Sequence, residues 1–93
     1  MRTFVIEYRY DDQDLARAEV RPEHRAFLRS LLDAGTLIAS GPFDGDTGAL
    51  LLVRAESQDA VADLFDTDPF HRAGLVAERT VRGWEPVLHT WAD

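Results

Sequence analysis

The alternation at the start of the chain is the feature that most constrains the fold. Apolar and aromatic residues fall at every second position, and mostly polar residues stand between them. Successive side chains of a strand point to opposite faces, so this period of two predicts a half-buried strand over residues 3–10. The rest of the chain must therefore cover one apolar face of a sheet. The alternating residues are Phe4, Ile6, Tyr8 and Tyr10.

A helix is predicted over residues 22–34, because apolar residues recur there with helical spacing. Pro22 suits the first helical position, where its missing N–H is not needed, and Gly35 suits a C-cap. Residues 11–21 are polar, and we expect a loop or a frayed turn of helix there. These bounds place His24 in the first turn, on the core-facing side. The apolar stripe consists of Phe27, Leu28, Leu31 and Leu32.

The middle of the chain predicts a β-hairpin. A short strand over residues 36–40 is stopped by Gly41-Pro42. Residues 43–48 have the composition of a turn, and residues 49–55 form an apolar run that predicts the second strand.

A second helix, a short helical turn and a last strand complete the chain. Ser57 can cap a helix that carries apolar residues at helical spacing. Asp68-Pro69 then begins a short helical turn that ends at Gly74. Residues 76–87 alternate enough for a final strand, and residues 88–93 form a C-terminal arm.

The predicted order is βαββαβ, which is the ferredoxin-like topology of the α+β class. It gives one domain over residues 1–93, with a four-stranded antiparallel sheet and the helices on one face. Several strands carry apolar residues on both sides, so the second face also needs cover. In a chain of 93 residues we expect a second copy to supply it, as a homodimer. Trp84 and Trp91 suit such an interface.

Composition limits the partners and the compartment. A formal net charge of −7 argues against a nucleic acid and against an anionic membrane surface. The chain has no cysteine, which excludes a disulfide, a thiolate nucleophile and a cysteine metal site. It shows neither a signal peptide nor an apolar run of about 18 residues, so we expect a cytoplasmic protein.

His24 and Asp68 are the candidate catalytic residues, because each lies at a predicted helix start that the fold can bring together. An imidazole oriented by a carboxylate is the minimal apparatus for general acid–base chemistry near neutral pH. A structural alternative stands beside each assignment. For His24 the alternative is a half-buried histidine at the edge of the apolar face, bonded to a backbone carbonyl, and the sequence by itself favours it. Asp68 directly before Pro69 is a good N-cap, which needs no catalytic role.

Four further residues are candidates for binding a small-molecule substrate. Ser40 and the Gly41 backbone stand at a strand end, where they can hold an oxyanion or a phenolate, although a Gly-Pro pair is more often only a turn. Phe70 and Tyr8 either wall the pocket or pack in the core. No metal site is predicted, because the three histidines lack a recognised ligand spacing, and no cofactor is implied.

Several short segments follow one another in an order and spacing that cover nearly the whole chain. They are Phe4 to Tyr10, His24-Arg25-Ala26-Phe27-Leu28, Ser40-Gly41-Pro42, Gly48, Asp68-Pro69-Phe70, Ala73-Gly74-Leu75 and Trp84-Glu85-Pro86-Val87. In this order the chain resembles the YciI-like proteins, the YCII-related domain family. The resemblance implies a dimeric α/β barrel with a His–Asp pair, here His24 and Asp68, in a pocket under the sheet. A few relatives are similar to dehydrochlorinases that act on chlorinated hydroxyquinols.

Three hypotheses for function follow. The first is a cofactor-free lyase, isomerase or dehydrochlorinase that moves a proton on a small hydroxylated cyclic or aromatic compound. The second is a non-catalytic module that binds a small metabolite in the same pocket. The third is a cofactor-free quinol monooxygenase, because dimeric α/β barrels also host that activity.

Overall fold

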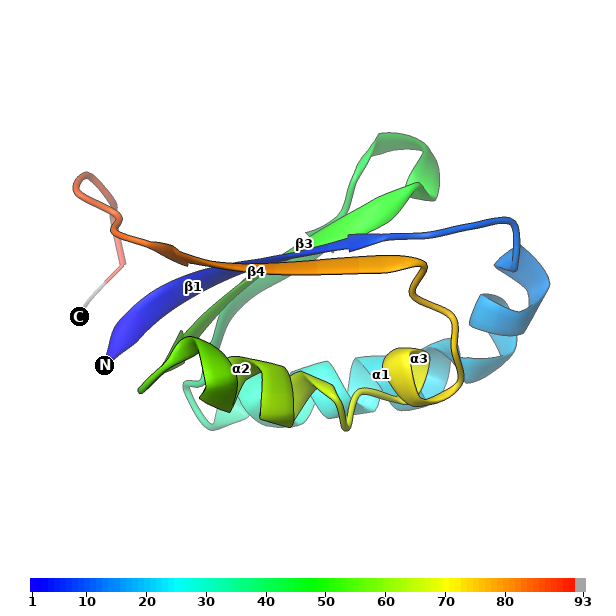
Figure 1. Cartoon of the computed structure of the whole chain (residues 1–93), viewed down its shortest axis with the longest axis horizontal. Coiled ribbons are helices and arrows are strands. Elements are labelled where there is room, and N and C mark those ends of the chain that lie inside the picture. Colours follow the sequence, from blue (N-terminus) through cyan, green and yellow to red (C-terminus); the bar gives the residue numbers. More distant parts are fainter. Residues whose placement is uncertain (92–93) are drawn as a thin grey trace.

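One four-stranded sheet lies over the α-helices, which all cover the same face, in the computed structural model of the chain (Figure 1). The structure describes residues 1–91. The strands are β1 (Arg2–Arg9), β2 (Leu37–Pro42), β3 (Gly48–Ala55) and β4 (Glu78–Trp84). The helices are α1 (Asp14–Asp33), α2 (Gln58–Phe65), α3 (Pro69–Arg72) and the short 3₁₀ turn η1 (Asp44–Asp46).

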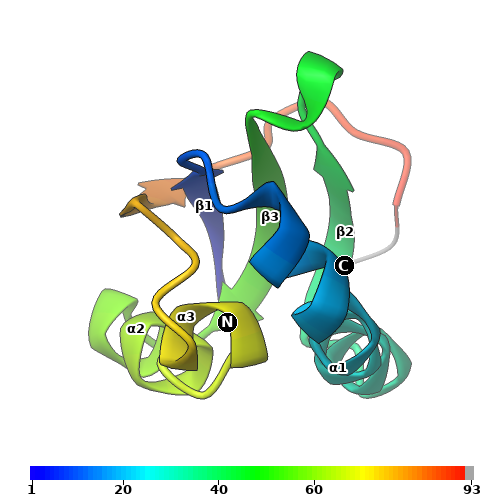
Figure 2. The same ribbon diagram turned by 90° about the vertical axis from the view of Figure 1, so that its right-hand side faces the viewer.

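The strand order is β2-β3-β1-β4, and each neighbouring pair is antiparallel. The two central strands are therefore the first and the third in the sequence, which confirms the predicted α+β fold of ferredoxin-like topology. Seen along the sheet, α1 lies under the β2–β3 side, and α2 and α3 lie under the β1–β4 side (Figure 2).

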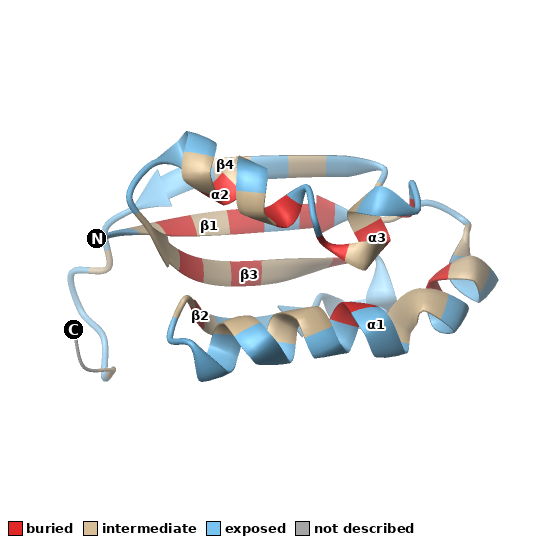
Figure 3. Cartoon of the chain, turned by 90° about the horizontal axis from the view of Figure 1, so that it is seen from below, coloured by how far each residue is buried: buried red, intermediate tan, exposed pale blue. Residues whose placement is uncertain are grey.

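The core lies between the sheet and the helices. Phe4, Ile6 and Tyr8 point inward from β1 and are buried, and Leu51 and Val53 face the core beside them from β3. Buried segments of β1 and β3 stand opposite buried turns of the helices (Figure 3). The alternation that opens the sequence thus defines the covered face of the sheet.

The predicted start of the first helix is wrong. Helix α1 begins at Asp14 rather than Pro22, and Pro22 stands inside it. The reason lies at Arg17, which is 1% exposed and takes the inward-facing position that an apolar residue would normally fill. A search for apolar periodicity does not detect such a turn. As a consequence His24 lies in the third turn of α1, away from the helix N-terminus.

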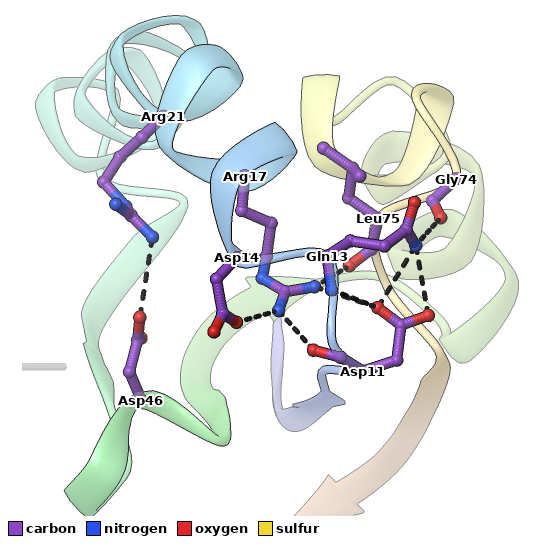
Figure 4. Close-up of polar contacts among 8 residues, drawn as sticks. All are labelled: Asp11, Gln13, Asp14, Arg17, Arg21, Asp46, Gly74 and Leu75. Carbon is purple, nitrogen blue, oxygen red and sulfur yellow. Dashed lines mark hydrogen bonds and ion pairs between the residues drawn. The ribbon is translucent and has the colours of Figure 1, made fainter.

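Arg17 satisfies its guanidinium with acceptors from three segments. It donates to the backbone oxygen and carboxylate of Asp11, to the Asp14 carboxylate at 2.8 Å and to the Leu75 carbonyl at 3.1 Å (Figure 4). It also lies over the Tyr10 ring, 4.5 Å from the ring centre. These contacts join the β1–α1 loop to the segment that follows α3.

Two strand ends also differ from the prediction. Strand β2 continues through Gly41 to Pro42, which pairs with Ala49. A proline is tolerated there because β2 is an edge strand and needs no second ladder partner. Strand β4 spans Glu78–Trp84 rather than residues 76–87, since Ala77 and Pro86 lie outside the ladder.

Beyond β4 the chain runs as an arm with exposed Val87 and Leu88. The expected arm extends to residues 92–93, which lie outside the described residues. Within residues 1–91, no helix combines the length with the apolar character needed to cross a membrane.

Candidate active site

His24 and Asp68 meet beneath the sheet. His24 comes from the third turn of α1, and Asp68 is the N-cap of α3, the helix that packs against α1. His24 Nδ1 lies 2.7 Å from Asp68 Oδ1. The two residues are 7% and 0% exposed, so the pair is held in the protein interior.

The Asp68 carboxylate has two more donors besides the imidazole. The Phe70 N–H donates to Oδ1 at 3.0 Å, which is the N-cap bond, and the Tyr8 hydroxyl donates to Oδ2 at 2.7 Å. Capping and contact with the histidine therefore coexist in one side chain. A buried carboxylate with a donor on each oxygen is fully satisfied and held in one orientation. Burial, followed by the negative charge of Asp68, raises the pKa of Tyr8, which keeps its proton on the phenol.

The His24 ring is held by a stacking contact on its face as well as by the Asp68 contact at Nδ1. It stacks on Phe70 with ring centres 3.9 Å apart and an angle of 3° between the planes. Both Asp68 oxygens accept hydrogen bonds, from the Phe70 N–H and the Tyr8 hydroxyl, so we assign the Nδ1–H of His24 as the donor to Oδ1. Among the described residues no protein group hydrogen bonds to Nε2. This nitrogen is therefore the one that can accept a proton from a ligand.

A cavity of about 590 Å³ adjoins the histidine. Its volume is within the range of small-molecule sites. It lies between α1, the β2–β3 hairpin and Phe70. The lining residues are Tyr10, Arg21, His24, Arg25, Leu28, Ser40, Gly41, Pro42, Phe43, Gly45, Asp46, Ala49, Leu51 and Phe70.

The predicted binding residues take different places around this cavity. Ser40, Gly41 and Phe70 line it together with His24. Tyr8 is outside the lining and contacts Asp68 instead, behind the imidazole. The structure thus places four of the six predicted site residues in the cavity wall. The other two, Asp68 and Tyr8, stand behind His24, where Asp68 bonds to the imidazole and Tyr8 bonds to Asp68.

Sequence reasoning missed the charged residues of the cavity, Arg21, Arg25 and Asp46. Arg21 is three residues before His24 and four before Arg25, so it neighbours both on the surface of α1. Correct bounds for α1 would have shown this relation. Asp46 follows no periodicity, because it lies in the turn between β2 and β3.

Neither of the remaining histidines lines this cavity. His71 faces Asp66 at 3.5 Å on the far side of α3, and His89 stacks on Trp91 in the arm. Among residues 1–91, the His, Asp and Glu side chains form no group of three that could hold a metal ion.

A second cavity, of about 570 Å³, lies between the N-terminus and the arm. Arg2, Trp84, Glu85 and His89 are part of its wall. Its carboxylate and its histidine, Glu85 and His89, stand on the exposed arm, whereas the buried His24–Asp68 pair is at the other cavity. The cavity beside His24 is therefore the candidate active site.

The fold and this geometry define a class: an α+β protein of βαββαβ topology with a buried His–Asp pair that faces a cavity under the sheet. The chain belongs to the YCII-related domain family, whose sequence model matches residues 1–85. The resemblance noted in the sequence is thereby confirmed.

Two similar proteins cover most of the chain. Protein YciI of Escherichia coli is 32% identical, over 77% of this chain and 84% of its own length. The 5-chloro-2-hydroxyhydroquinone dehydrochlorinase of Burkholderia phenoliruptrix is 30% identical, with a TM-score of 0.78 over 89% of this chain and 93% of that one. Its structure holds 2,5-dihydroxybenzoquinone.

A more distant structural likeness concerns the fold alone. An antibiotic biosynthesis monooxygenase has a TM-score of 0.59 over 95% of this chain and all of its own, at 15% identity. This likeness shows that the two chains share an architecture, and it carries no information about the reaction.

Proposed function

We propose that this protein catalyses a cofactor-free proton transfer on a small hydroxylated cyclic or aromatic compound, as a lyase, isomerase or dehydrochlorinase. His24 is the general acid–base and Asp68 orients it. One observation carries the proposal: Nδ1 is tied to a buried carboxylate, and Nε2 is the ring nitrogen left for a ligand in the adjoining cavity.

The cavity suits a planar hydroxylated ring. Tyr10, Leu28 and Phe70 provide apolar and aromatic wall, and the Ser40 hydroxyl provides a polar group at the β2 edge. A dehydrochlorinase 30% identical to this chain holds a dihydroxyquinone, which is a ligand of this kind.

For a dehydrochlorination the proposed step removes one proton and one chloride. In the keto tautomer of a chlorinated hydroxyquinol, the carbon that bears chlorine is tetrahedral. His24 Nε2 accepts the proton of a remaining ring hydroxyl, and the O–H electron pair forms a carbonyl. The conjugated double bond shifts and the C–Cl bond breaks, which releases chloride and leaves a hydroxyquinone.

The test is turnover of 5-chloro-2-hydroxyhydroquinone, followed by chloride release and by quinone absorbance. His24→Asn keeps a polar group of similar size but cannot take the proton. We expect the variant to lose about 10²- to 10⁴-fold in kcat and to keep ligand affinity within about tenfold. His71→Asn is the matched control, because His71 lies outside the cavity. Equal turnover by the wild type and His24→Asn would remove His24 from the mechanism.

Measurements of ligand binding and of oxygen consumption, made beside this assay, separate the two other functions. A metabolite-binding module predicts binding with no turnover of any hydroxylated aromatic in a wider panel. A quinol monooxygenase predicts oxygen consumption with hydroquinones.

We also propose that the protein is a homodimer whose sheets face each other. The outer face of the sheet carries half-buried Val5, Leu50 and Leu52 and exposed Trp84, which form an apolar surface in the single chain. Sedimentation at micromolar concentration should give about twice the 10.5 kDa of the chain. A monomer at that concentration would contradict this arrangement.

A further inference from the structure

The charge of the cavity wall is opposite to that of the whole chain. The chain has a formal net charge of −7, yet two arginines, Arg21 and Arg25, line the cavity beside His24. Among the lining residues Asp46 is the sole carboxylate. Arg25 makes no ion pair or hydrogen bond with the described residues. A wall of this kind is suited to a ligand that carries negative charge.

Arg21 has a weak partner. Its Nη2 lies 3.5 Å from Asp46 Oδ2 (Figure 4), and both residues line the cavity. A strong hydrogen bond between a guanidinium and a carboxylate is shorter, at about 2.7–2.9 Å. The Arg21 and Asp46 side chains are 30% and 60% exposed, and an ion pair in such surroundings contributes little. An anionic ligand can therefore replace Asp46 at small cost.

The backbone of the turn that carries Asp46 is fixed. Asp46 has a φ of 55°, a conformation that aspartate tolerates better than most residues. Its N–H donates to the Phe43 carbonyl at 3.0 Å, and the Tyr10 N–H, just after β1, donates to the Thr47 carbonyl of the same turn at 2.9 Å. The turn thus holds the Asp46 backbone near Arg21, while its carboxylate stays free to move aside.

We propose that the ligand of this cavity carries an anionic oxygen, as a carboxylate or an ionised ring hydroxyl, and that this oxygen displaces Asp46 from Arg21. The inference deepens the proposed function and rests on the same site. Arg21 and His24 are three residues apart on one face of α1, so a ring at Nε2 can place a substituent at the guanidinium. An ionised ring hydroxyl is also the group that a proton transfer to His24 creates.

Three probes of similar size separate the two sources of charge. They are 2,5-dihydroxybenzoate, which has a carboxylate, 2,5-dihydroxybenzoquinone, whose acidic hydroxyls ionise at neutral pH, and hydroquinone, which stays neutral. Affinities are measured by isothermal titration calorimetry in anaerobic buffer at pH 7. We expect at least one anion to bind about tenfold or more tightly than hydroquinone, and the tighter anion identifies the source.

Two substitutions that should change anion affinity in opposite directions test the roles of Arg21 and Asp46. Arg21→Gln should weaken the anion about tenfold and leave hydroquinone unchanged, whereas Arg29→Gln removes the same charge from α1 outside the cavity and should change neither. Asp46→Asn should tighten the anion severalfold, because it removes the competing carboxylate. Asp44→Asn is its control, since Asp44 lies in the same turn and outside the lining.

The proposal is overturned if hydroquinone binds as tightly as both anions, if neither anion binds, or if Asp46→Asn weakens the anion. These outcomes are independent of the turnover assay. Turnover of the chlorinated hydroxyquinol without any anion preference would sink this inference and leave the proposed function standing. Anion binding without turnover of any panel compound would support this inference and contradict the proposed catalytic function.

Discussion

Two polar networks built around residues of α1 differ in whether all their hydrogen-bonding groups are used within the protein. One centres on Arg17 and the other on the His24–Asp68 pair, two turns further along α1. The Arg17 contacts all end on acceptors of the protein itself. The His24 network has three donors on Asp68 and leaves Nε2 beside a cavity. A network closed on itself stabilises a fold, whereas one with an atom left at a cavity can act on a ligand.

The largest effect is expected when the imidazole proton of His24 is moved from Nδ1 to Nε2. In Asp68→Asn the new amide N–H can donate to Nδ1, which moves the imidazole proton to Nε2 and blocks the base. We expect turnover to fall by about 10²- to 10⁴-fold, measured as quinone formation under saturating substrate. Circular dichroism provides the control that the variant is folded. Near wild-type turnover would show that Asp68 serves only as a helix cap.

Breaking the closed network should affect stability and leave chemistry intact. Arg17→Met leaves the buried Leu75 carbonyl without its donor and removes the tie between two segments. We expect the free energy of unfolding to fall by roughly 2–3 kcal/mol, measured by urea denaturation. Arg29→Met, an exposed change on the same helix, should cost less than about 0.5 kcal/mol. A loss of turnover per folded molecule in Arg17→Met would contradict the assignment of stability to the Arg17 network and of chemistry to the His24–Asp68 network.

Substitution of Tyr8 tests whether the hydrogen bonds around Asp68 support both the stability of the protein and its chemistry. Tyr8→Phe removes the hydroxyl that donates to Asp68 Oδ2 and keeps the ring in the core. We expect a loss of about 1–2 kcal/mol in the free energy of unfolding and a fall in kcat of about tenfold, with KM unchanged. The measurements are urea denaturation and steady-state kinetics. A purely structural Tyr8 would lower the stability and leave kcat at the wild-type value.

The smallest effect concerns pH. The hydrogen bond from Gln13, followed by the contact with Arg17, holds the pKa of Asp11 below its usual value. A lowered pKa in the folded state gives stability above the unfolded pKa of about 4, which is lost as the pH falls further. The stability difference between the wild type and Asp11→Asn should therefore be present at pH 6 and shrink by pH 3. An equal difference at both values would exclude this linkage.

The sequence predicted the element order and the pairing of His24 with Asp68, but it did not reveal which residues surround the pair. Alternation and caps are local signals, and Ser57 and Asp68 cap their helices as expected. Arg17 hid the first turns of α1, because a buried arginine leaves no apolar period. The same error concealed the relation of Arg21 to His24.

The role of Tyr8 depended on tertiary structure. Alternation along β1 shows that its side chain faces inward, and both a core residue and a pocket wall agree with that pattern. Only the position of α3 under the sheet brings Asp68 to the phenol. The approach of Asp46 to Arg21 is also invisible in the sequence, because it depends on where the β2–β3 turn lies relative to α1.

The tautomer of His24 decides whether this residue can act as a base, and its measurement needs no substrate. Long-range ¹H–¹⁵N correlation spectra of the uniformly ¹⁵N-labelled protein distinguish a protonated ring nitrogen from a bare one. When His24 is neutral, we expect the proton on Nδ1 and a bare Nε2, and we expect Asp68→Asn to shift the proton to Nε2. A proton on Nε2 in the wild-type protein would contradict the role of His24 as a base, because His24 could then not accept a proton from a ligand in the cavity.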